Sequence, residues 1–357
     1  MNMNGACWMR RSLGEPVSAL YIDSQNNVIA GGWNGRLIKW SASGDELWSV
    51  QLPDRIGSIS ISSNGIYATA GLHICAVQLA NGSVIWQQAL EGSADTVLAT
   101  EELIYATSSV YDIEHNDFIE SAIWCFDKLG NEVWKRYMAE RPWTLNQYQG
   151  DLYLGLGRPK MGLACVTKDG KLSQIALASE APVTAAAIAT NGVLFGHANG
   201  DLTNSEGKLY AGKGESINTL SLSSDRTIII AYDQEIIRLD ADYNEVAKVL
   251  LGSITAISFG FKIGETGSVW AGIQEGKTGL LKVVSLTDGS DITSMQCGKI
   301  NALVSNNNRI VVGDELGEIY VWEEAMFNRR INSTQVDEAV DEHYQTMRDR
   351  LNALRKR

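Results

Sequence analysis

The sequence has few of the residues from which disulfide frameworks and metal sites are built. Its 357 residues include five cysteines, widely spaced and without a C-x-x-C pair, and four histidines with no pair at metal-ligand spacing. We therefore expect neither a disulfide framework nor a zinc site. We expect the cysteines to be small buried residues in a reducing compartment. They are Cys7, Cys75, Cys125, Cys165 and Cys297.

Long apolar stretches are also missing. The first residues, MNMNGACWMRRSLGEP, contain no apolar core of about 7 to 15 residues, and nowhere do about 18 apolar residues follow one another. We expect no secretory signal and no membrane span, and hence a cytoplasmic protein.

Positive charge is scarce: 30 Lys and Arg stand against 42 Asp and Glu, which gives a net charge of −12 at pH 7. Such a chain repels polyanions, so we do not expect nucleic acid to be a partner. Apolar residues make up 45% of the chain, with 10 Trp, 12 Tyr and 6 Phe. That supply is ample for a large core and excludes a disordered protein.

Catalytic motifs are absent as well. The sequence has no G-x-S-x-G, and the glycine-rich stretch GLGRPKMG at 155–162 lacks the G-K-[S/T] ending of a phosphate-binding loop. We therefore predict that the protein is not an enzyme, with no catalytic residues, no cofactor and no metal.

What the sequence does have is a repeat. Three segments each hold an apolar strand, a polar turn ending in glycine, and a second strand with Trp four residues after that glycine. They are GRLIKWSASGDELW at 35–48, ICAVQLANGSVIW at 74–86 and AIWCFDKLGNEVW at 122–134. Weaker copies bring the number of units to eight, with first strands starting near 17, 56, 95, 143, 183, 217, 254 and 300.

These units predict an all-β fold, an eight-bladed β-propeller of four-stranded antiparallel blades over residues 1–325. The intervals between starts run from 34 to 48 residues, which suits one blade per unit. The last unit is one strand short after GEIYVWEE, whereas ACWMRRSLGEPVSAL aligns with ELWSVQLPDRIGSIS and sets Trp8 opposite Trp48. We therefore expect residues 5–13 to complete the last blade and close the ring.

The segments LANGSVIW (79–86) and DKLGNEVW (127–134) resemble the repeats of the pyrroloquinoline-quinone-like, or quinoprotein-like, propeller superfamily. The endings GRLIKW (35–40) and GEIYVW (317–322) resemble WD-repeat propellers, without the Trp-Asp and Gly-His hallmarks. The first resemblance implies a ring that holds a quinone and a calcium ion in the family's enzymes. This chain lacks the adjacent cysteines those enzymes often have, so a cofactor-binding propeller enzyme is kept only as the alternative.

Candidate binding residues lie where the repeat is interrupted. The connections at 110–121 and 157–162 are longer than their counterparts, and both are expected on one face of the ring, near residues 139–144 and the first blade's matching turn. Aromatic and basic side chains of the kind found at protein-binding hot spots gather in these loops. They are Trp33, Tyr111, His115, Arg141, Trp143, Arg158 and Lys160. The other interpretation is that these loop residues only pack against their neighbours or face water, and bind no partner.

The C-terminal segment departs from the repeat altogether. Residues 326–357 are predicted to form a linker and then an amphipathic helix from about Ser333, with an apolar stripe at heptad spacing. The stripe includes Tyr344, Met347, Leu351 and Leu354. Docking on the propeller, pairing with a second copy or a partner helix, and contact with an anionic surface all stay open. The sequence thus predicts a non-catalytic protein-interaction scaffold that binds an unidentified protein through rim loops, this helix, or both.

Overall fold

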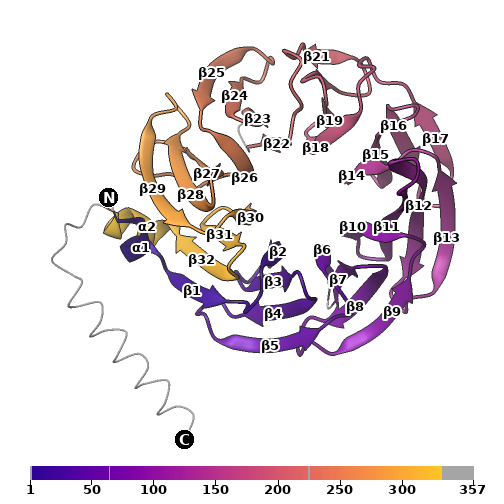
Figure 1. Cartoon of the computed structure of the whole chain (residues 1–357), viewed down its shortest axis with the longest axis horizontal. Coiled ribbons are helices and arrows are strands. Elements are labelled where there is room, and N and C mark those ends of the chain that lie inside the picture. The colour runs from indigo at the N-terminus through magenta and orange to yellow at the C-terminus, as the bar shows by residue number, and fades with distance from the viewer. Residues whose placement is uncertain (1, 64, 224–225, 332–357) are drawn as a thin grey trace, which may run out of the picture.

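The computed structural model describes residues 2–63, 65–223 and 226–331, and in these ranges the strands form eight four-stranded antiparallel sheets arranged as a ring (Figure 1). The predicted eight-bladed all-β propeller is confirmed. The first strands of the blades begin within two residues of the starts expected from the repeat.

Blades one to four follow the chain without interruption. Blade one holds β2 (Val17–Ile22), β3 (Val28–Gly32), β4 (Arg36–Trp40) and β5 (Glu46–Gln51). Blade two holds β6 (Ile56–Ser62), β7 (Gly65–Ala70), β8 (His73–Gln78) and β9 (Val84–Ala89). Blade three holds β10 (Ser93–Ala99), β11 (Leu103–Asp112), β12 (Asp117–Asp127) and β13 (Glu132–Met138). Blade four holds β14 (Pro142–Tyr148), β15 (Asp151–Leu156), β16 (Leu163–Val166) and β17 (Leu172–Ile175).

Blades five to eight complete the ring, the last with a strand from the N-terminus. Blade five holds β18 (Val183–Ala189), β19 (Gly192–His197), β20 (Leu202–Thr203) and β21 (Lys208–Tyr210). Blade six holds β22 (Thr219–Leu222), β23 (Ile228–Ala231), β24 (Glu235–Leu239) and β25 (Glu245–Leu250). Blade seven holds β26 (Ser253–Phe259), β27 (Ser268–Glu275), β28 (Thr278–Ser285) and β29 (Asp291–Cys297). Blade eight holds β30 (Ile300–Ser305), β31 (Arg309–Asp314), β32 (Glu318–Glu323) and β1 (Met9–Ser12).

The core lies between neighbouring blades, around their second and third strands. Every residue of β7 and β31 is buried, because both faces of these strands pack against adjacent sheets, whereas the outer strand β9 is mostly exposed. Near the axis the blades crowd: a Cβ added to Gly31 would lie 2.6 Å from Ile56 of the next blade. The same approach recurs at Gly155, Gly196, Gly272 and Gly313. Small residues in the second strands therefore allow the blades to converge.

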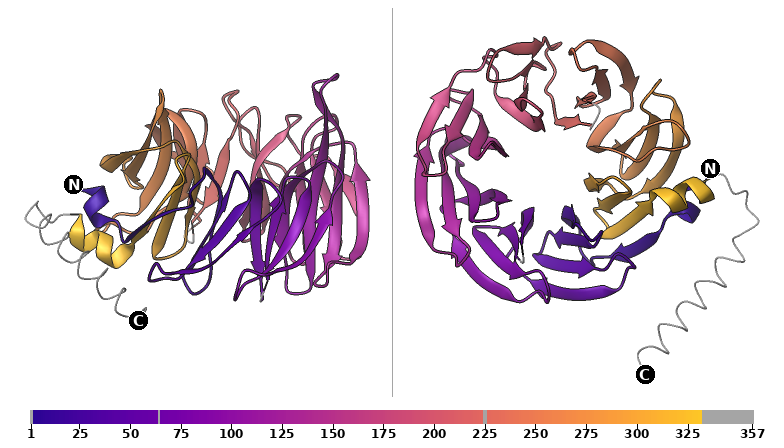
Figure 2. Two further views of the ribbon diagram at one scale, coloured as in Figure 1. Left: turned by 60° about the horizontal axis from the view of Figure 1, so that its bottom comes forward. Right: turned by 180° about the vertical axis from the view of Figure 1, so that it is seen from behind.

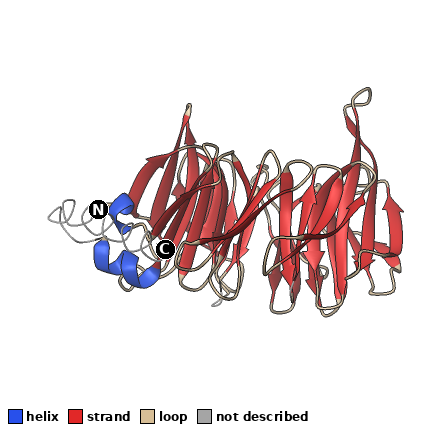
Figure 3. Ribbon diagram, turned by 90° about the horizontal axis from the view of Figure 1, so that it is seen from below, coloured by secondary structure: helices blue, strands red, loops and turns tan. Residues whose placement is uncertain are grey.

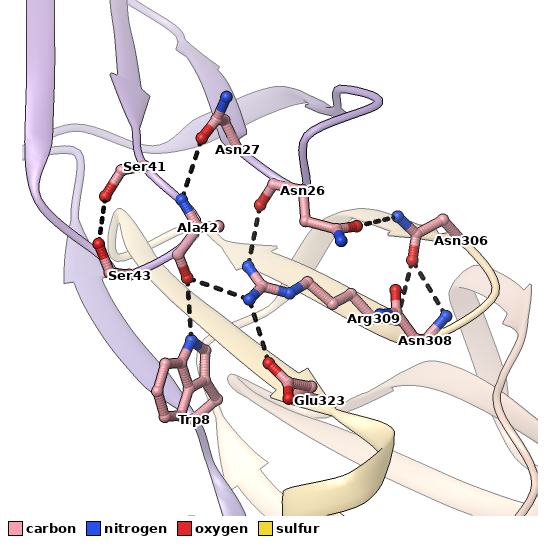
Figure 4. A network of polar contacts seen from close by, with 10 residues as sticks. All are labelled: Trp8, Asn26, Asn27, Ser41, Ala42, Ser43, Asn306, Asn308, Arg309 and Glu323. Carbon is pink, nitrogen blue, oxygen red and sulfur yellow. Dashed lines mark hydrogen bonds and ion pairs between the residues drawn. The ribbon is translucent and has the colours of Figure 1, made fainter.

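The N-terminal strand closes the ring, as the sequence predicted. Strand β1 pairs antiparallel with β32 from Met9 opposite Val321 to Ser12 opposite Glu318. A polar network joins blade eight to blade one: the Arg309 guanidinium donates to the backbone oxygens of Asn26 (2.9 Å) and Ala42 (3.0 Å) (Figure 4). The indole N–H of Trp8 donates to the same Ala42 oxygen at 3.1 Å.

Two short helices pack together beside blades seven and eight. They are α1 (Met3–Ala6) and α2 (Glu324–Arg330). The Phe327 ring of α2 is fully buried and lies 5.4 Å from both Phe261 and Trp270, and Trp322 donates to the Met3 oxygen at 3.0 Å. Residues 326–330, expected to be part of a linker, are therefore helical, because Phe327 and the buried Ile331 anchor them to the core. The helix predicted from Ser333 lies outside the described residues.

Candidate protein-binding surface on the upper face

The connections between second and third strands lie on the same face of the ring, here called the upper face. On it the β11–β12 hairpin stands out, because its strands have 10 and 11 residues where their counterparts in blade two have six each. The hairpin rises above the neighbouring blades (Figures 2 and 3). Its pairing continues up to Asp112 opposite Asp117, past a register shift at Val110 and Tyr111. The long loop expected at 110–121 is thus mostly a rigid ladder.

The upper part of this hairpin meets the first strand of blade four in a cluster of rings around one guanidinium. The Phe118 ring lies 5.1 Å from Tyr111 and 6.2 Å from Trp143, both edge-on. The Arg141 guanidinium lies over Phe118 at 4.0 Å and over Trp143 at 4.3 Å, within cation–π range of both rings. Tyr111 and Trp143 keep 48% and 49% of their surface exposed. We call these four residues the aromatic cluster.

Arg141 is held in place from below by an acidic partner. Its Nη2 lies 2.7 Å from Oδ1 of Asp95, and the Ser109 hydroxyl donates to the other carboxylate oxygen at 2.6 Å. Burial raises the pKa of Asp95, and the bonds from Ser109 and Arg141 offset only part of that effect. The backbone of Arg141 is also engaged, because the Gly157 N–H donates to its oxygen at 2.9 Å. The cluster is therefore organised before any partner arrives.

The structure brings three of the predicted site residues together in the aromatic cluster: Tyr111, Arg141 and Trp143. His115 lies near the hairpin tip, exposed, with Nδ1 2.6 Å from the Asp112 carboxylate, and this contact lowers the pKa of Asp112. Arg158 and Lys160 lie exposed in the loop that starts at Gly157, next to Trp143.

Trp33 lies elsewhere on the upper face. It is 46% exposed, and its ring contact is with Arg55, whose guanidinium lies 4.0 Å from the ring centre. This pair spans blades one and two, whereas the aromatic cluster spans blades three and four. The predicted residues thus divide into two groups on one face.

Several residues of this surface were not singled out from the sequence. Phe118 links Tyr111 to Trp143, and Asp95 fixes Arg141. Ile113 and Ile119 of the hairpin are 86% and 53% exposed. The sequence could have predicted these residues. In VYDIEHNDFIES apolar residues alternate with acidic ones, and this pattern indicates an exposed hairpin that carries apolar as well as polar side chains.

The described residues offer no cluster of ligands for the calcium ion of the quinoprotein enzymes. Among them no group of three or more His, Cys, Asp or Glu side chains is arranged to hold a metal ion. Burial raises the pKa of the Cys75 and Cys125 thiols to about 12, so these sulfurs are not nucleophiles at neutral pH. The buried His197 is engaged on both sides, with Ala181 O at 2.9 Å and the Thr203 hydroxyl at 2.7 Å.

The other residues predicted to bind a partner lie outside the described part of the chain, in 332–357: Tyr344, Met347, Leu351 and Leu354. Neither helix within the described ranges is long and apolar enough to cross a bilayer.

Comparisons with solved structures place the fold among known propellers. BamB from Moraxella catarrhalis superimposes with a TM-score of 0.69 at 14% identity, over 89% of this chain and 97% of that chain. Sqt1 from Saccharomyces cerevisiae gives 0.72 at 13% identity, over 89% and 99%. The computationally designed Ika8 protein gives 0.65 at 16% identity, over 88% and 98%. At these identities the likeness shows the fold alone.

The sequence comparison is more specific. No curated protein sequence matches the chain significantly. Residues 6–248 match a family model described as outer membrane protein assembly factor BamB, and this span covers more than half of the chain, including the Gly-to-Trp repeats. The chain therefore belongs to this family of pyrroloquinoline-quinone-like propellers.

Proposed function

We propose that this protein is a non-catalytic interaction scaffold whose upper face binds a protein partner at blades three and four. The observation that carries the proposal is the aromatic cluster, in which Arg141 is fixed between Phe118 and Trp143 while Tyr111 and Trp143 stay half exposed. Trp, Tyr and Arg are the side chains most enriched among residues that dominate protein–protein binding energy.

Pre-organisation strengthens this argument. Binding normally loses affinity because side chains must be ordered, at about 0.5–1.5 kcal/mol for each flexible one. Here the Asp95 carboxylate and the two rings already hold the Arg141 guanidinium, so little further ordering is needed. The long hairpin also stands above the ring, which suits the surface of another protein better than a small molecule enclosed in a concave pocket.

The matched family supports a role of this class, because it is described as an outer membrane protein assembly factor. The partner of this chain is left unnamed in the proposal. We also propose a cytoplasmic location, as expected from the sequence.

The test compares proteins captured by three immobilised full-length baits. The baits are the native chain, a Tyr111→Ala/Trp143→Ala variant, and a Trp33→Ala control that removes an equally exposed aromatic ring from the same face. We expect a set of proteins bound by the native and control baits and lost from the double variant. Identical sets from all three folded baits would overturn the proposal. Circular dichroism melting checks that the variants fold, since half-exposed rings contribute little to stability.

A further inference from the structure

The β11–β12 hairpin presents exposed apolar side chains in an acidic setting. Ile113 is 86% exposed and Ile119 is 53% exposed, and Tyr111 lies beside them at 48%. Four carboxylates belong to the same short segment: Asp112, Glu114, Asp117 and Glu120. We call these seven residues the hairpin surface. Its exposed apolar side chains favour association with an apolar surface, and its negative charge repels acidic partners.

The complement of the hairpin surface is a segment that is both apolar and basic. Like charges opposed across an interface cost affinity, whereas opposite charges speed association and set its orientation. An amphipathic helix with basic residues beside its apolar stripe meets both requirements, and laying such a stripe against an apolar surface is a common mode of peptide recognition.

The chain carries a segment of this chemistry at its own end. Residues 347–357, MRDRLNALRKR, contain five basic residues and one acidic residue, around Met347, Leu351 and Leu354 of the predicted apolar stripe. Charge and apolarity thus match the hairpin surface, which holds four carboxylates. The segment follows α2, which ends at Arg330.

Geometry opposes contact of this segment with the hairpin surface of its own molecule. Figure 1 shows α2 and the β11–β12 hairpin on opposite sides of the ring. A helix over 333–357 would be about 37 Å long, whereas a compact chain of this size is about 50 Å across. In addition, α2 continues from the end of β32 on the lower face, while the hairpin rises from the upper face. The occupant that fits is the tail of another molecule.

We propose that residues 344–357 of one molecule bind the hairpin surface of a second copy, so that the protein self-associates tail to hairpin. This inference rests on the proposed function, because it identifies a partner for the upper face at blades three and four. The apolar stripe contacts Ile113 and Ile119, and the basic end contacts the carboxylates around them.

Charge reversal with rescue tests the proposal on the full-length chain. The first variant is Glu114→Lys/Asp117→Lys/Glu120→Lys, and the second is Arg355→Glu/Lys356→Glu/Arg357→Glu. Sedimentation equilibrium measures the association of each variant alone and of the two mixed. We expect each variant alone to associate at least about tenfold more weakly than the native chain, since three favourable pairs become repulsive. The mixture should recover association, because opposite charges again face each other.

The matched control is Glu275→Lys/Gln274→Lys on the β27–β28 hairpin, which also rises on the upper face, in blade seven. This control should associate like the native chain. A fluorescent peptide of residues 332–357 gives a second readout: it should bind the native chain and bind the hairpin variant at least about tenfold more weakly.

Three results would overturn the inference. The native chain could be monomeric throughout. The hairpin variant could associate as well as the native chain, which would mean that tails pair with each other or with another surface. The mixture could fail to recover association. None of these results bears on capture of other proteins through Tyr111 and Trp143, so the proposed function is judged separately.

Discussion

Trp134 of blade three donates its indole N–H to the backbone oxygen of Lys168 in blade four at 3.1 Å, and its ring lies against Gly170 of the same turn. A Cβ on Gly170 would lie 2.7 Å from the Trp134 ring. The Gly-to-Trp spacing of the repeat thus joins these two blades: the tryptophan of blade three covers the glycine of blade four.

The same contact recurs at two preceding seams, as we call the junctions between neighbouring blades: one joins blades one and two, and the other joins blades two and three. Trp48 donates to Leu79 O at 3.1 Å and lies on Gly82, and Trp86 donates to Lys128 O at 3.0 Å and lies on Gly130. Bonds of the indole N–H satisfy a donor that would otherwise be partly buried without a partner. The Gly-to-Trp repeat is therefore also the contact that holds neighbouring blades side by side at these three junctions.

Replacing Trp134 with alanine should destabilise the ring. Trp134 is 8% exposed, and deletion of a buried tryptophan side chain costs about 3–5 kcal/mol. We expect a loss of about 3 kcal/mol in the free energy of unfolding, measured by urea denaturation. Trp33→Ala, at a site 46% exposed, is the control and should change stability by less than about 0.5 kcal/mol. Equal effects of the two substitutions would contradict the role assigned to the seam.

The seam between blades six and seven lacks this tryptophan. Ala247 pairs with Arg238 next to a register shift, as Trp134 pairs with Cys125, so alanine takes the tryptophan position. Ala247, Val249 and Gly289 line a small cavity there, and Arg238 Nη1 donates to Leu286 O in place of an indole.

Ala247→Trp should therefore stabilise the chain, because the new ring fills the cavity. Cavity-filling substitutions commonly add about 0.5–2 kcal/mol. The urea midpoint of the variant should rise while the slope of the transition stays unchanged. Ala247→Ser at the same position is the control and should not raise it. A lower midpoint for the tryptophan variant would show that Arg238 and Val249 already fill the seam.

Ring closure should depend on Arg309 more than on another arginine of the same blade. Arg309 is 5% exposed and bonds to Asn26 and Ala42 of blade one and to Glu323 of its own blade (Figure 4). Hydrogen bonds to charged groups contribute about 1.5–3 kcal/mol. We expect Arg309→Met to lower the free energy of unfolding by about 2–3 kcal/mol.

The matched control for that prediction is Arg10→Met. Arg10 also pairs with a glutamate, Glu318, at 2.6 Å, but its side chain is 62% exposed. An exposed pair contributes about 0–1 kcal/mol. If both variants lost the same amount in thermal and urea denaturation, the Arg309 network would not be what closes the ring.

Asp201 should make blade five sensitive to acid. Burial by itself raises the pKa of Asp201, but bonds from Lys208, Gly212, Ser179 and Asn199 outweigh it and lower that pKa well below its ordinary value. A lowered pKa of an acid in the folded state stabilises the protein above the unfolded-state pKa of about 3.9, and this contribution is lost as the pH falls through the folded-state value.

The variant Asp201→Asn should thus be less stable than the native chain at pH 7, by about 1–2 kcal/mol. The difference should shrink as the pH falls below about 4, because the carboxyl of the unfolded chain takes up a proton there while the folded state still holds it ionised. Urea midpoints measured from pH 7 to pH 2 give the comparison. Asp242→Asn is the control at an exposed turn. If the stability difference between the two proteins stayed constant with pH, the loss would come from altered packing or hydrogen bonding and not from the charge of Asp201.

The local pattern was enough to predict the ring and its closure. Trp8 was placed opposite Trp48 by alignment alone, and both indoles donate to a turn oxygen of the following blade. This succeeds because each blade is built from contacts within about 40 residues and the same spacing recurs. The helix α2 was not predicted because it is held by Phe327, which packs on Phe261 and Trp270. This contact joins residues far apart in the sequence and is not part of the repeat.

The candidate site depended on distances that no spacing encodes. Arg141 and Asp95 are 46 residues apart and meet only because blades three and four lie side by side. Trp33 resembles Trp143 in type and exposure, yet the ring places it with Arg55 on other blades. The sequence by itself determined how many blades there are, which residues build them and where the repeat is interrupted. Only the tertiary structure decided which interruptions share a surface, because that follows from the angle between blades around the axis.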